Sequence, residues 1–568
     1  MAISAIPPGV VLILGAFLLP FLGRRLRGGY ALALPLVVLG LVWQIPDGVQ
    51  LGAGFVGQDL EIVRGDRLAR LFATIFAFMA FAGGLFALKQ RKVTELVAAY
   101  VYAGGAIGVA FAGDLITVFI FWEMMALAST LVIWSAGTAK SRKAGMRYLA
   151  IHILGGVLLM AGIADYVQYT GTASFGADPI QLLLGTDRPG TWLILAGFLI
   201  NAGAPPLSAW LPDAYPEASF SGTVFLSAFT TKTAVYVLLR GFPGFDVLIF
   251  LGLYMVFYGI IYALLENDAR RILSYSIINQ VGFMVTGIGI GSEMALNGTA
   301  AHAFTHIIYK ALLLMSAGSV MYMTGGRTKC TDLGGLFRSM PITAVCGIIG
   351  ALAISSFPLT SGFISKSMIS QGAADLDLAI VWTLLMAASA GVFLHAGIKF
   401  PWFVFFQKDS GLRPKDPPWS MRASMILLAF LCIAIGVWPD PLYAILPFQV
   451  NYLPYTGPHV VESLQLLLFA GLAFFVLLPF MKRTLTISLD FDWFYRVFGK
   501  IVAREFNWRG GKLRDGALTG FRHAGGFFLK RVFHYHGPAG ILARSLSTGS
   551  TVLWIVLLLG IYLAVYFS

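Results

Sequence analysis

The sequence predicts an all-α, polytopic membrane protein. Of its 568 residues, 58% are hydrophobic and only 12% are charged, a balance too apolar for a soluble chain with a single anchor. Apolar runs divide the chain into about sixteen segments long enough to cross a bilayer as helices. Lysine and arginine gather in alternate connecting loops, as is typical when basic loops stay on the cytoplasmic side.

The predicted spans follow one another with short connections. They are residues 6–23, 30–45, 66–88, 94–112, 114–135, 144–168, 191–211, 219–240, 246–265, 270–290, 296–323, 341–369, 378–406, 423–446, 461–481 and 551–567. Residues 46–65 are too polar to span, and their glycine-bounded, partly alternating pattern predicts a short external hairpin. The first apolar run has no basic residues before it, so we expect a retained span and not a cleaved signal.

Basic residues set the expected orientation. One side of the alternating spans holds Arg24, Arg25, Arg27, Lys89, Arg91, Lys92, Lys140, Arg142, Lys143, Arg147, Arg270, Arg271, Arg327, Lys329, Arg338, Lys408, Arg413, Lys415 and Arg422. The opposite side holds only Arg64, Arg67, Arg70, Arg188 and Arg240. This asymmetry predicts a cell-membrane (inner-membrane) protein of prokaryotic type, with both termini outside and the basic loops in the cytoplasm. Since the net charge of +13 lies in short loops, it does not indicate nucleic-acid binding.

The chain divides into successive regions. We expect N-terminal helices in 1–93, a first helical repeat in 94–240, a second in 246–406, two further helices in 407–481, a basic segment in 482–550 and a last span in 551–568. The basic segment is rich in aromatic residues, and stretches such as 495–506 are amphipathic. We expect it in the cytoplasm, as helices lying along the inner membrane surface or clamping a neighbouring subunit.

Most spans have no ionisable residue at mid-depth, so the exceptions are informative. They are Glu123, His152, Lys232, His302, His306, Lys310, Lys366, His395 and Lys399. A charge at that depth costs several kcal/mol unless its surroundings are wet, polar or paired. Burial disfavours the charged forms of lysine and histidine, whereas a nearby carboxylate favours them. Groups held between these influences at intervals through a bilayer can relay protons.

Each of these residues also has a structural interpretation. Lys232 can snorkel or pair between helices. The row His302, His306 and Lys310 lies on one helix face and can be a hydrogen-bond network; a zinc site there lacks a carboxylate or cysteine and would face a repelling lysine. His152, beside two glycines, can be a packing residue, and Lys399 an interfacial anchor. The three cysteines are far apart, so we expect no metal, haem or iron–sulfur site, no disulfide framework and no cofactor.

Two spans carry helix breakers. Residues 197–214 include Pro205 and Pro206, and residues 353–366 include Pro358. Proline removes a backbone hydrogen bond and kinks or breaks a helix, and broken backbone at membrane depth is tolerated where it lines a polar cavity. Two interrupted spans five helices apart predict an inverted repeat, spans 4–8 against spans 9–13; the alternative is two ordinary kinks.

Several motifs in this order resemble a known family. They are Phe121-Trp-Glu-Met-Met-Ala-Leu, Pro205-Pro-Leu-Ser-Ala-Trp-Leu-Pro-Asp-Ala, Asp268-Ala-Arg-Arg-Ile-Leu-Ser-Tyr-Ser, the row from His302 to Lys310, and Phe357-Pro-Leu-Thr-Ser-Gly-Phe-Ile-Ser-Lys. They resemble the antiporter-like subunits of respiratory complex I, membrane hydrogenases and Mrp-type multisubunit cation/proton antiporters. The exact residues of these motifs are most similar to those of the D subunit of Mrp antiporters and its membrane-hydrogenase relatives. The resemblance covers residues 60–480 and implies a fourteen-helix core with two inverted five-helix repeats.

The resemblance also implies roles. Glu123 matches the fifth-helix glutamate, Lys232 the linking lysine, the row His302, His306 and Lys310 the central axis, and Lys366 the terminal residue. One position departs: the family's proton-carrying lysine in broken helix seven is Asn201 here, and an amide cannot titrate. Either the first half runs without its usual switch, or it is inactive, or the ion preference has changed.

The expected function is therefore proton conduction inside a hetero-oligomeric membrane complex, with protons and Na⁺ as the transported ions. We expect a transporter subunit and not an enzyme. The alternatives are a proton-pumping, non-catalytic subunit of a complex I-like or hydrogenase-type redox complex or of an inorganic-carbon uptake complex, and a mainly structural scaffold.

Overall fold

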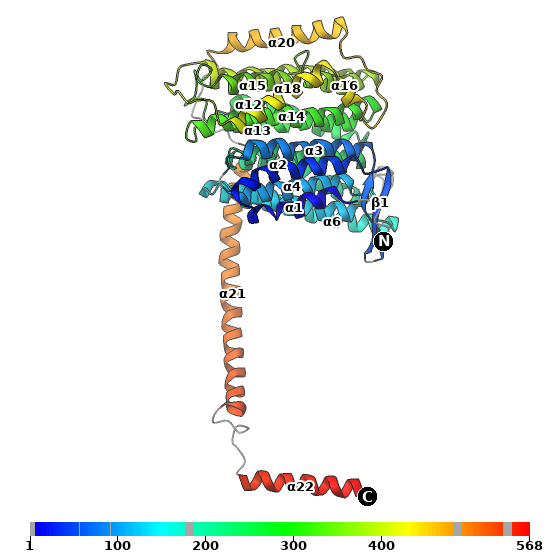
Figure 1. The fold of residues 1–568 in the computed structure, drawn as a ribbon, viewed down its shortest axis with the longest axis vertical. Coiled ribbons are helices and arrows are strands. Elements are labelled where there is room, and N and C mark those ends of the chain that lie inside the picture. Colours follow the sequence, from blue (N-terminus) through cyan, green and yellow to red (C-terminus); the bar gives the residue numbers. More distant parts are fainter. Residues whose placement is uncertain are drawn as a thin grey trace. The chain divides into compact units, whose positions relative to one another are not determined.

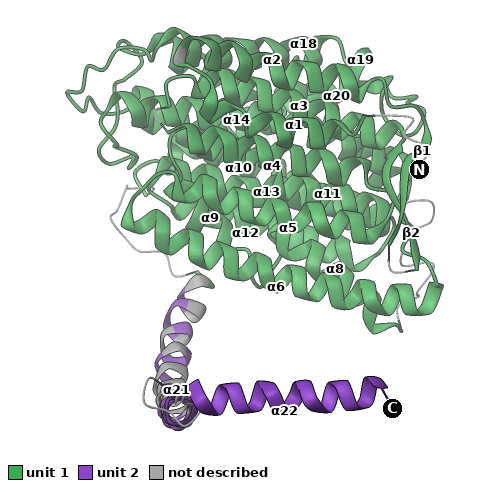
Figure 2. Ribbon diagram, turned by 60° about the horizontal axis from the view of Figure 1, so that its bottom comes forward, with its two compact units in different colours: residues 1–492 green, residues 493–568 purple. Residues whose placement is uncertain are grey.

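A computed structural model describes residues 6–55, 57–90, 92–175, 187–480, 490–537 and 548–567. The chain forms two compact units, Met1–Asp492 and Trp493–Ser568 (Figure 2). Among the described residues, thirteen helices are long and apolar enough to cross a membrane, and three shorter apolar helices accompany them. These sixteen helical segments coincide with the predicted spans, so the all-α polytopic prediction is confirmed.

The N-terminal region contains three helices and a hairpin. Its elements are α1 (Pro8–Ala16), a 3-10 turn (Leu19–Phe21), α2 (Arg24–Val42), β1 (Gly48–Phe55), β2 (Gln58–Gly65) and α3 (Arg67–Ala87). The two strands pair antiparallel, from Phe55 opposite Gln58 to Gly48 opposite Gly65, which confirms the hairpin expected from residues 46–65. Its external position stays a prediction.

The region predicted as the first repeat follows. It comprises α4 (Val93–Phe111), α5 (Leu115–Trp134), α6 (Ala139–Thr170), α8 (Pro189–Ala202), α9 (Trp210–Ala214), a 3-10 turn (Tyr215–Glu217), α10 (Gly222–Ala228) and α11 (Thr230–Gly241). Asp114 caps α5 by accepting from the Thr117 amide, which satisfies one of the donors left free at a helix start. The span expected over 219–240 is not one continuous helix: it is interrupted at Phe229, between α10 and α11.

The region predicted as the second repeat and the helices after it complete the first unit. They are α12 (Val247–Leu265), α13 (Ala269–Ile290), α14 (Glu293–Met323), α15 (Pro341–Ile354), α16 (Ser361–Asp375), α17 (Ala379–Val392), π-helical turns (Phe393–Lys399 and Trp402–Phe406), α18 (Trp419–Val437), α19 (Asp440–Tyr443) and α20 (Gly457–Leu477). Figure 1 shows these helices side by side with those of the first repeat.

The two repeats meet along α13 and α14. α13 contacts α9 and α11, and α14 contacts α10 and α11. Arg270, near the start of α13, donates to the backbone carbonyls of Ala218 and Ser219 at 2.9 Å each. The interrupted helix α10–α11 therefore lies next to α14, the helix that carries the histidine and lysine row, whereas α9 lies against α13.

The second unit contains α21 (Asp492–His536) and α22 (Thr548–Phe567). α21 is one long helix, where the sequence predicted amphipathic helices in 482–550; residues 481–489 and 538–547 lie outside the described ranges. The side chains of residues 551–567 in α22 are all exposed, and the helix is apolar along its length, as expected of a span that faces lipid or another subunit.

Candidate functional site

The buried ionisable residues singled out by the sequence lie in the first unit. Lys232, His302, His306 and Lys310 are completely buried, Lys366 is 2% exposed, and Glu123 is half-buried. No ion pair within the described ranges includes any of them. Buried charges are usually paired. These six residues are therefore either stabilised by something other than an opposite charge or charged only part of the time.

The first helix break lies between α8 and α9. Gly203 ends α8 with φ +79°, a left-handed conformation that glycine adopts without steric cost. Pro205 and Pro206 follow, and the helix resumes at Trp210. The Trp210 indole donates to the Ile200 carbonyl at 2.9 Å, so it satisfies one of the acceptors that the break leaves free. The break predicted around these prolines is confirmed.

Glu123 and Asn201 contact neighbouring glycines of α6. A Cβ built at Gly156 would lie 1.9 Å from Glu123 Oε1, and one at Gly155 would lie 3.7 Å from Asn201 Oδ1. Both oxygens are buried and have no hydrogen-bond partner among the described residues. Buried oxygens of this kind are normally hydrogen-bonded, so a water molecule would satisfy either of them, and protonation would turn the Glu123 oxygen into a donor. Gly156 is therefore what lets Glu123 approach α6, whereas Asn201 would be in ordinary van der Waals contact with a Cβ at position 155.

His152 packs against the first break. Its Nδ1 lies 2.9 Å from the Tyr148 carbonyl, and its ring stacks on Tyr148 at 3.9 Å and meets Trp210 edge-on at 4.7 Å. Its Nε2 has no partner among the described residues. These contacts favour the packing interpretation of His152, which joins α6 to α9.

Lys232 sits at the interruption between α10 and α11. Its Nζ donates to the Ser227 carbonyl at 2.7 Å and to Thr231 Oγ1 at 3.1 Å. Ser227 belongs to the last turn of α10, where carbonyls lack helical partners and the helix dipole is negative. The helix end therefore supplies the partial negative charge that an ion pair would otherwise provide.

α14 carries the row expected on one helix face. His302 Nδ1 lies 3.2 Å from Ser365 Oγ, and its Nε2 lies 3.1 Å from Gln280 Oε1. Hydrogen bonds therefore fix this ring between α13 and α16. In contrast, both ring nitrogens of His306, and Nζ of Lys310, have no partner among the described residues. The row thus combines one fixed histidine with two groups that packing alone holds.

The second break lies between α15 and α16, around Pro358, as predicted. Ser356 (φ 59°) and Leu359 (φ 68°) adopt left-handed backbone conformations there, which strain residues other than glycine and are concentrated at functional sites. At Gly362 the chain passes so close to α15 that a Cβ would lie 1.8 Å from the Ala353 carbonyl oxygen. The close packing of Gly362 against Ala353 therefore helps to hold this strained connection in place.

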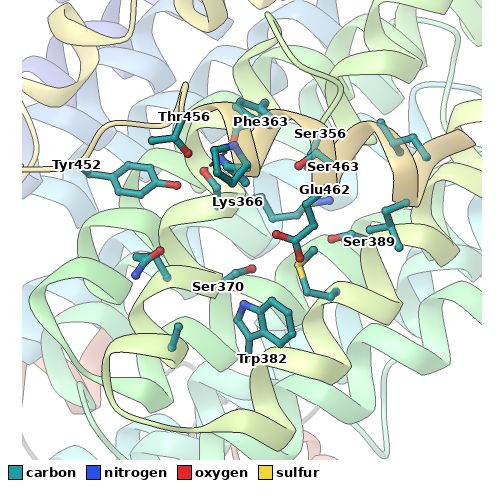
Figure 3. A pocket seen from close by; sticks show the side chains of 18 of the residues that line it. Ser356, Phe363, Lys366, Ser370, Trp382, Ser389, Tyr452, Thr456, Glu462 and Ser463 are labelled. Atoms are coloured by element: carbon teal, nitrogen blue, oxygen red, sulfur yellow. Dashed lines mark hydrogen bonds between the residues drawn. The ribbon is translucent and has the colours of Figure 1, made fainter.

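Lys366 lies just after this break, beside a cavity of about 420 Å³. Its Nζ donates to the Ile354 carbonyl at 3.1 Å and lies 4.8 Å from the centre of the Phe283 ring. The cavity is bounded by α16, α17 and α20, and Figure 3 shows Lys366 and Glu462 pointing into it from α16 and α20. Residues from helices that are distant in the sequence thus meet at one site.

Lys399 and His395 occupy the π-helical turn after α17. Lys399 Nζ donates to the carbonyls of Ala263, Leu264 and Glu266, at 3.0, 2.6 and 2.6 Å. These carbonyls form the C-terminal end of α12. His395 Nδ1 lies 2.9 Å from the Gly391 carbonyl. Lys399 is therefore a helix cap at a buried position, where the sequence suggested an interfacial anchor or an accessory relay group.

Glu266 follows α12 in the connection to α13. Its carboxylate accepts from Arg271 Nε at 2.8 Å. Burial by itself would raise the pKa of Glu266, but the Arg271 guanidinium outweighs that effect and holds the pKa below its usual value. This carboxylate stays charged, next to the helix end that Lys399 caps.

Three buried lysines thus share one arrangement, which sequence reasoning missed. Lys232, Lys366 and Lys399 each donate to carbonyls at a helix C-terminal end. Sequence reasoning also missed Gln280, Ser365 and Glu462. The only sequence feature that could have predicted the lysine arrangement is the position of these residues near interrupted helices. No sequence feature marks Glu462, because a glutamate near the start of an apolar helix is common.

Known proteins share this architecture. Residues 112–393 match the family described as NADH:quinone oxidoreductase/Mrp antiporter, TM. The D subunit of the Na(+)/H(+) antiporter of Alkalihalophilus pseudofirmus is 28% identical over 71% of this chain and 83% of its own length. These matches support an Mrp antiporter-like subunit.

Similar proteins also occur in other complexes, and a solved structure shares the fold. The antiporter-like subunit is 28% identical to the M subunit of NADH-quinone oxidoreductase of Pseudomonas aeruginosa, over 60% of this chain and 70% of that protein. A chain in the structure of the Mrp complex from Dietzia sp. DQ12-45-1b superimposes with a TM-score of 0.75 at 22% identity. That match covers 98% of the subunit but only 62% of the Dietzia chain, so the subunit spans less than two thirds of it and the match establishes the fold alone.

Proposed function

We propose that this subunit conducts protons within a multisubunit monovalent cation/proton antiporter, with Na⁺ as the exchanged cation. The observation that carries the proposal is a set of buried or half-buried titratable groups that form no ion pair with any described residue. They are Glu123, Lys232, His302, His306, Lys310 and Lys366. A purely structural helix bundle gains nothing from a buried lysine without a counter-ion. The relative in Alkalihalophilus, named as a component of a Na(+)/H(+) antiporter, supports the choice of ion.

The helix ends explain how the lysines can change charge. An ammonium at a helix C-terminus is stabilised by the dipole without a fixed counter-ion, so its proton can leave without stranding a buried carboxylate. Lys310 and His306 lack even these partners, and a proton reaching one is repelled by charge on the next through a low-dielectric interior. The row thereby passes charge along α14 between Lys232 and Lys366.

Asn201 makes the two halves unequal. An amide at position 201 can donate a hydrogen bond but cannot carry a proton, so the first half lacks the lysine that the family resemblance leads us to expect there. We propose that Lys366 and its cavity form the more active end, and that Glu123 acts in a modified first half. We propose further that the subunit works together with other membrane subunits of the complex in the lipid bilayer. Its basic loops face the cytoplasm.

A second candidate is a proton-pumping, non-catalytic subunit of a redox complex. The similarity to the M subunit of NADH-quinone oxidoreductase favours it. In that case the same residues move protons, but a redox partner and not a cation gradient drives them.

Cation-driven proton movement in everted vesicles containing the whole complex tests the proposal. Lys366→Ala should abolish it, and Glu123→Ala or Lys232→Ala should reduce it as far as the first half contributes. Proton movement that follows electron donors and ignores Na⁺ and K⁺ would favour the redox candidate. Full exchange in all three variants, with the complex intact, would contradict both.

A further inference from the structure

We propose that the cavity beside Lys366 is a binding site for one monovalent metal cation, held by Glu462, by hydroxyl oxygens and by the C-terminal end of α15 when Lys366 is neutral. This inference rests on the proposed function and names the place where cation and proton compete.

The cavity is rich in side chains that offer oxygen atoms. The second break supplies Ser355 and Ser356, and helices α16 and α17 supply Ser370 and Ser389. Thr456 precedes α20, and Glu462 lies within α20. Hard cations bind carboxylate, carbonyl and hydroxyl oxygens. A volume of about 420 Å³ exceeds that of a bare ion, so the cation keeps part of its water shell.

Ser356 gives a second, independent indication of a ligand. Its Oγ is buried, and it has no hydrogen-bond partner among the described residues, although Ser356 lines the cavity. Its backbone is also held at φ 59°, a conformation that costs free energy for serine. Ser356 thus combines a strained backbone with an unsatisfied hydroxyl at the wall of the cavity, and a bound cation would give that oxygen a partner.

The end of α15 points its negative dipole at the same place. Its Ile354 carbonyl already accepts from the Lys366 ammonium at 3.1 Å. Interrupted helices use such ends to coordinate Na⁺ or protons in transporters. One helix end therefore serves either the ammonium or a metal cation.

Charge balance at this site couples binding of a cation to release of a proton. Glu462 is the one carboxylate among the described residues that line the cavity. Lys366 is buried and Glu462 is exposed. With Lys366 protonated the site has no net charge, and a further cation is repelled by the ammonium. With Lys366 neutral, the carboxylate attracts a cation. Binding of Na⁺ thus accompanies release of the Lys366 proton, and no other bond forms or breaks.

Transport by the reconstituted whole complex tests the site. For Glu462→Gln we expect the apparent affinity for NaCl to fall about tenfold or more, with the maximal rate at saturating NaCl retained. Ser370→Ala should shift the affinity in the same direction by less. Glu293→Gln is the matched control, because Glu293 is an exposed glutamate in the first turn of α14. A lower maximal rate with unchanged affinity would make Glu462 a proton acceptor only and overturn the inference.

Equilibrium binding of ²²Na⁺ to the detergent-solubilised complex separates the inference from the proposed function. We expect binding to strengthen from neutral to alkaline pH, to be lost in Glu462→Gln, and to become independent of pH in Lys366→Ala. Equal binding in wild type and Glu462→Gln overturns the site even when exchange is normal. Competition between protons and ²²Na⁺ without any transport leaves the site standing and contradicts the antiporter proposal.

Discussion

Replacing Gly156 with alanine should displace Glu123 while leaving the fold intact. The new Cβ would lie 1.9 Å from Oε1, 2.8 Å from Cδ and 3.3 Å from Oε2 of Glu123. Real Cβ contacts stay beyond 3.0 Å, so Oε1 must retreat by about 1.1 Å, the difference between these two distances. All three atoms belong to one carboxylate, so the whole group moves.

The energetic terms favour movement of Glu123 over unfolding. Alanine improves the helix propensity of a glycine position by about 1 kcal/mol, and a distorted glutamate rotamer costs about 0.5–1.5 kcal/mol. These terms nearly cancel, so the free energy of unfolding should change little. A misplacement of about 1 Å at a reacting group can lower a rate about 10²-fold, so the loss should appear in transport.

Gly155 provides the matched control on the same helix. A Cβ there has its nearest neighbour, Ile200 Cγ2, at 3.3 Å, and Asn201 Oδ1 at 3.7 Å. We expect Gly155→Ala to transport nearly as wild type, and Gly156→Ala to fall to the level of Glu123→Ala, in everted vesicles with equal amounts of assembled complex. Equal impairment of both glycine variants, or wild-type exchange in Gly156→Ala where Glu123→Ala is inactive, would refute the reasoning.

Two further substitutions distinguish transport from structure. Asn201→Lys adds an ammonium to the first half, where Glu123 Oε1 has no partner among the described residues. We therefore expect altered coupling, measured as protons moved per cation; an unchanged ratio and rate would remove any special role for this position. Lys399→Met removes the cap of α12 and leaves one buried and two part-buried carbonyls without their donor. An unsatisfied buried acceptor costs about 1–3 kcal/mol, so we expect a lower unfolding temperature of the complex by fluorescence thermal shift. An unaltered unfolding temperature would show that the cap contributes nothing.

Much of the fold is predictable because membrane helices leave strong local signals. Long apolar runs locate all sixteen spans, and Pro205, Pro206 and Pro358 mark the two breaks, since proline cannot continue a helix hydrogen-bond ladder. The 46–65 hairpin is visible from glycines and alternation. Each of these features depends on residues that are close together in the sequence.

The remaining features depend on contacts between distant segments. The interruption at Phe229 has no proline or glycine to announce it, and the bond from Lys232 to the Ser227 carbonyl becomes visible only in three dimensions. Glu462 joins Lys366 because α20 packs beside α16 and α17. Burial identified Lys232 and Lys366 as unusual, but the reason they are tolerated, a helix end in place of a carboxylate, is a property of the folded backbone.

Lys310→Met tests the central claim most directly, because Lys310 Nζ is fully buried without a partner among the described residues. Methionine has a similar shape and removes only the charge, so a structural account predicts equal or greater stability of the complex. We expect an assembled complex with an unchanged or higher unfolding temperature and no cation-driven proton movement in everted vesicles. Exchange at the wild-type rate would contradict proton conduction through this row.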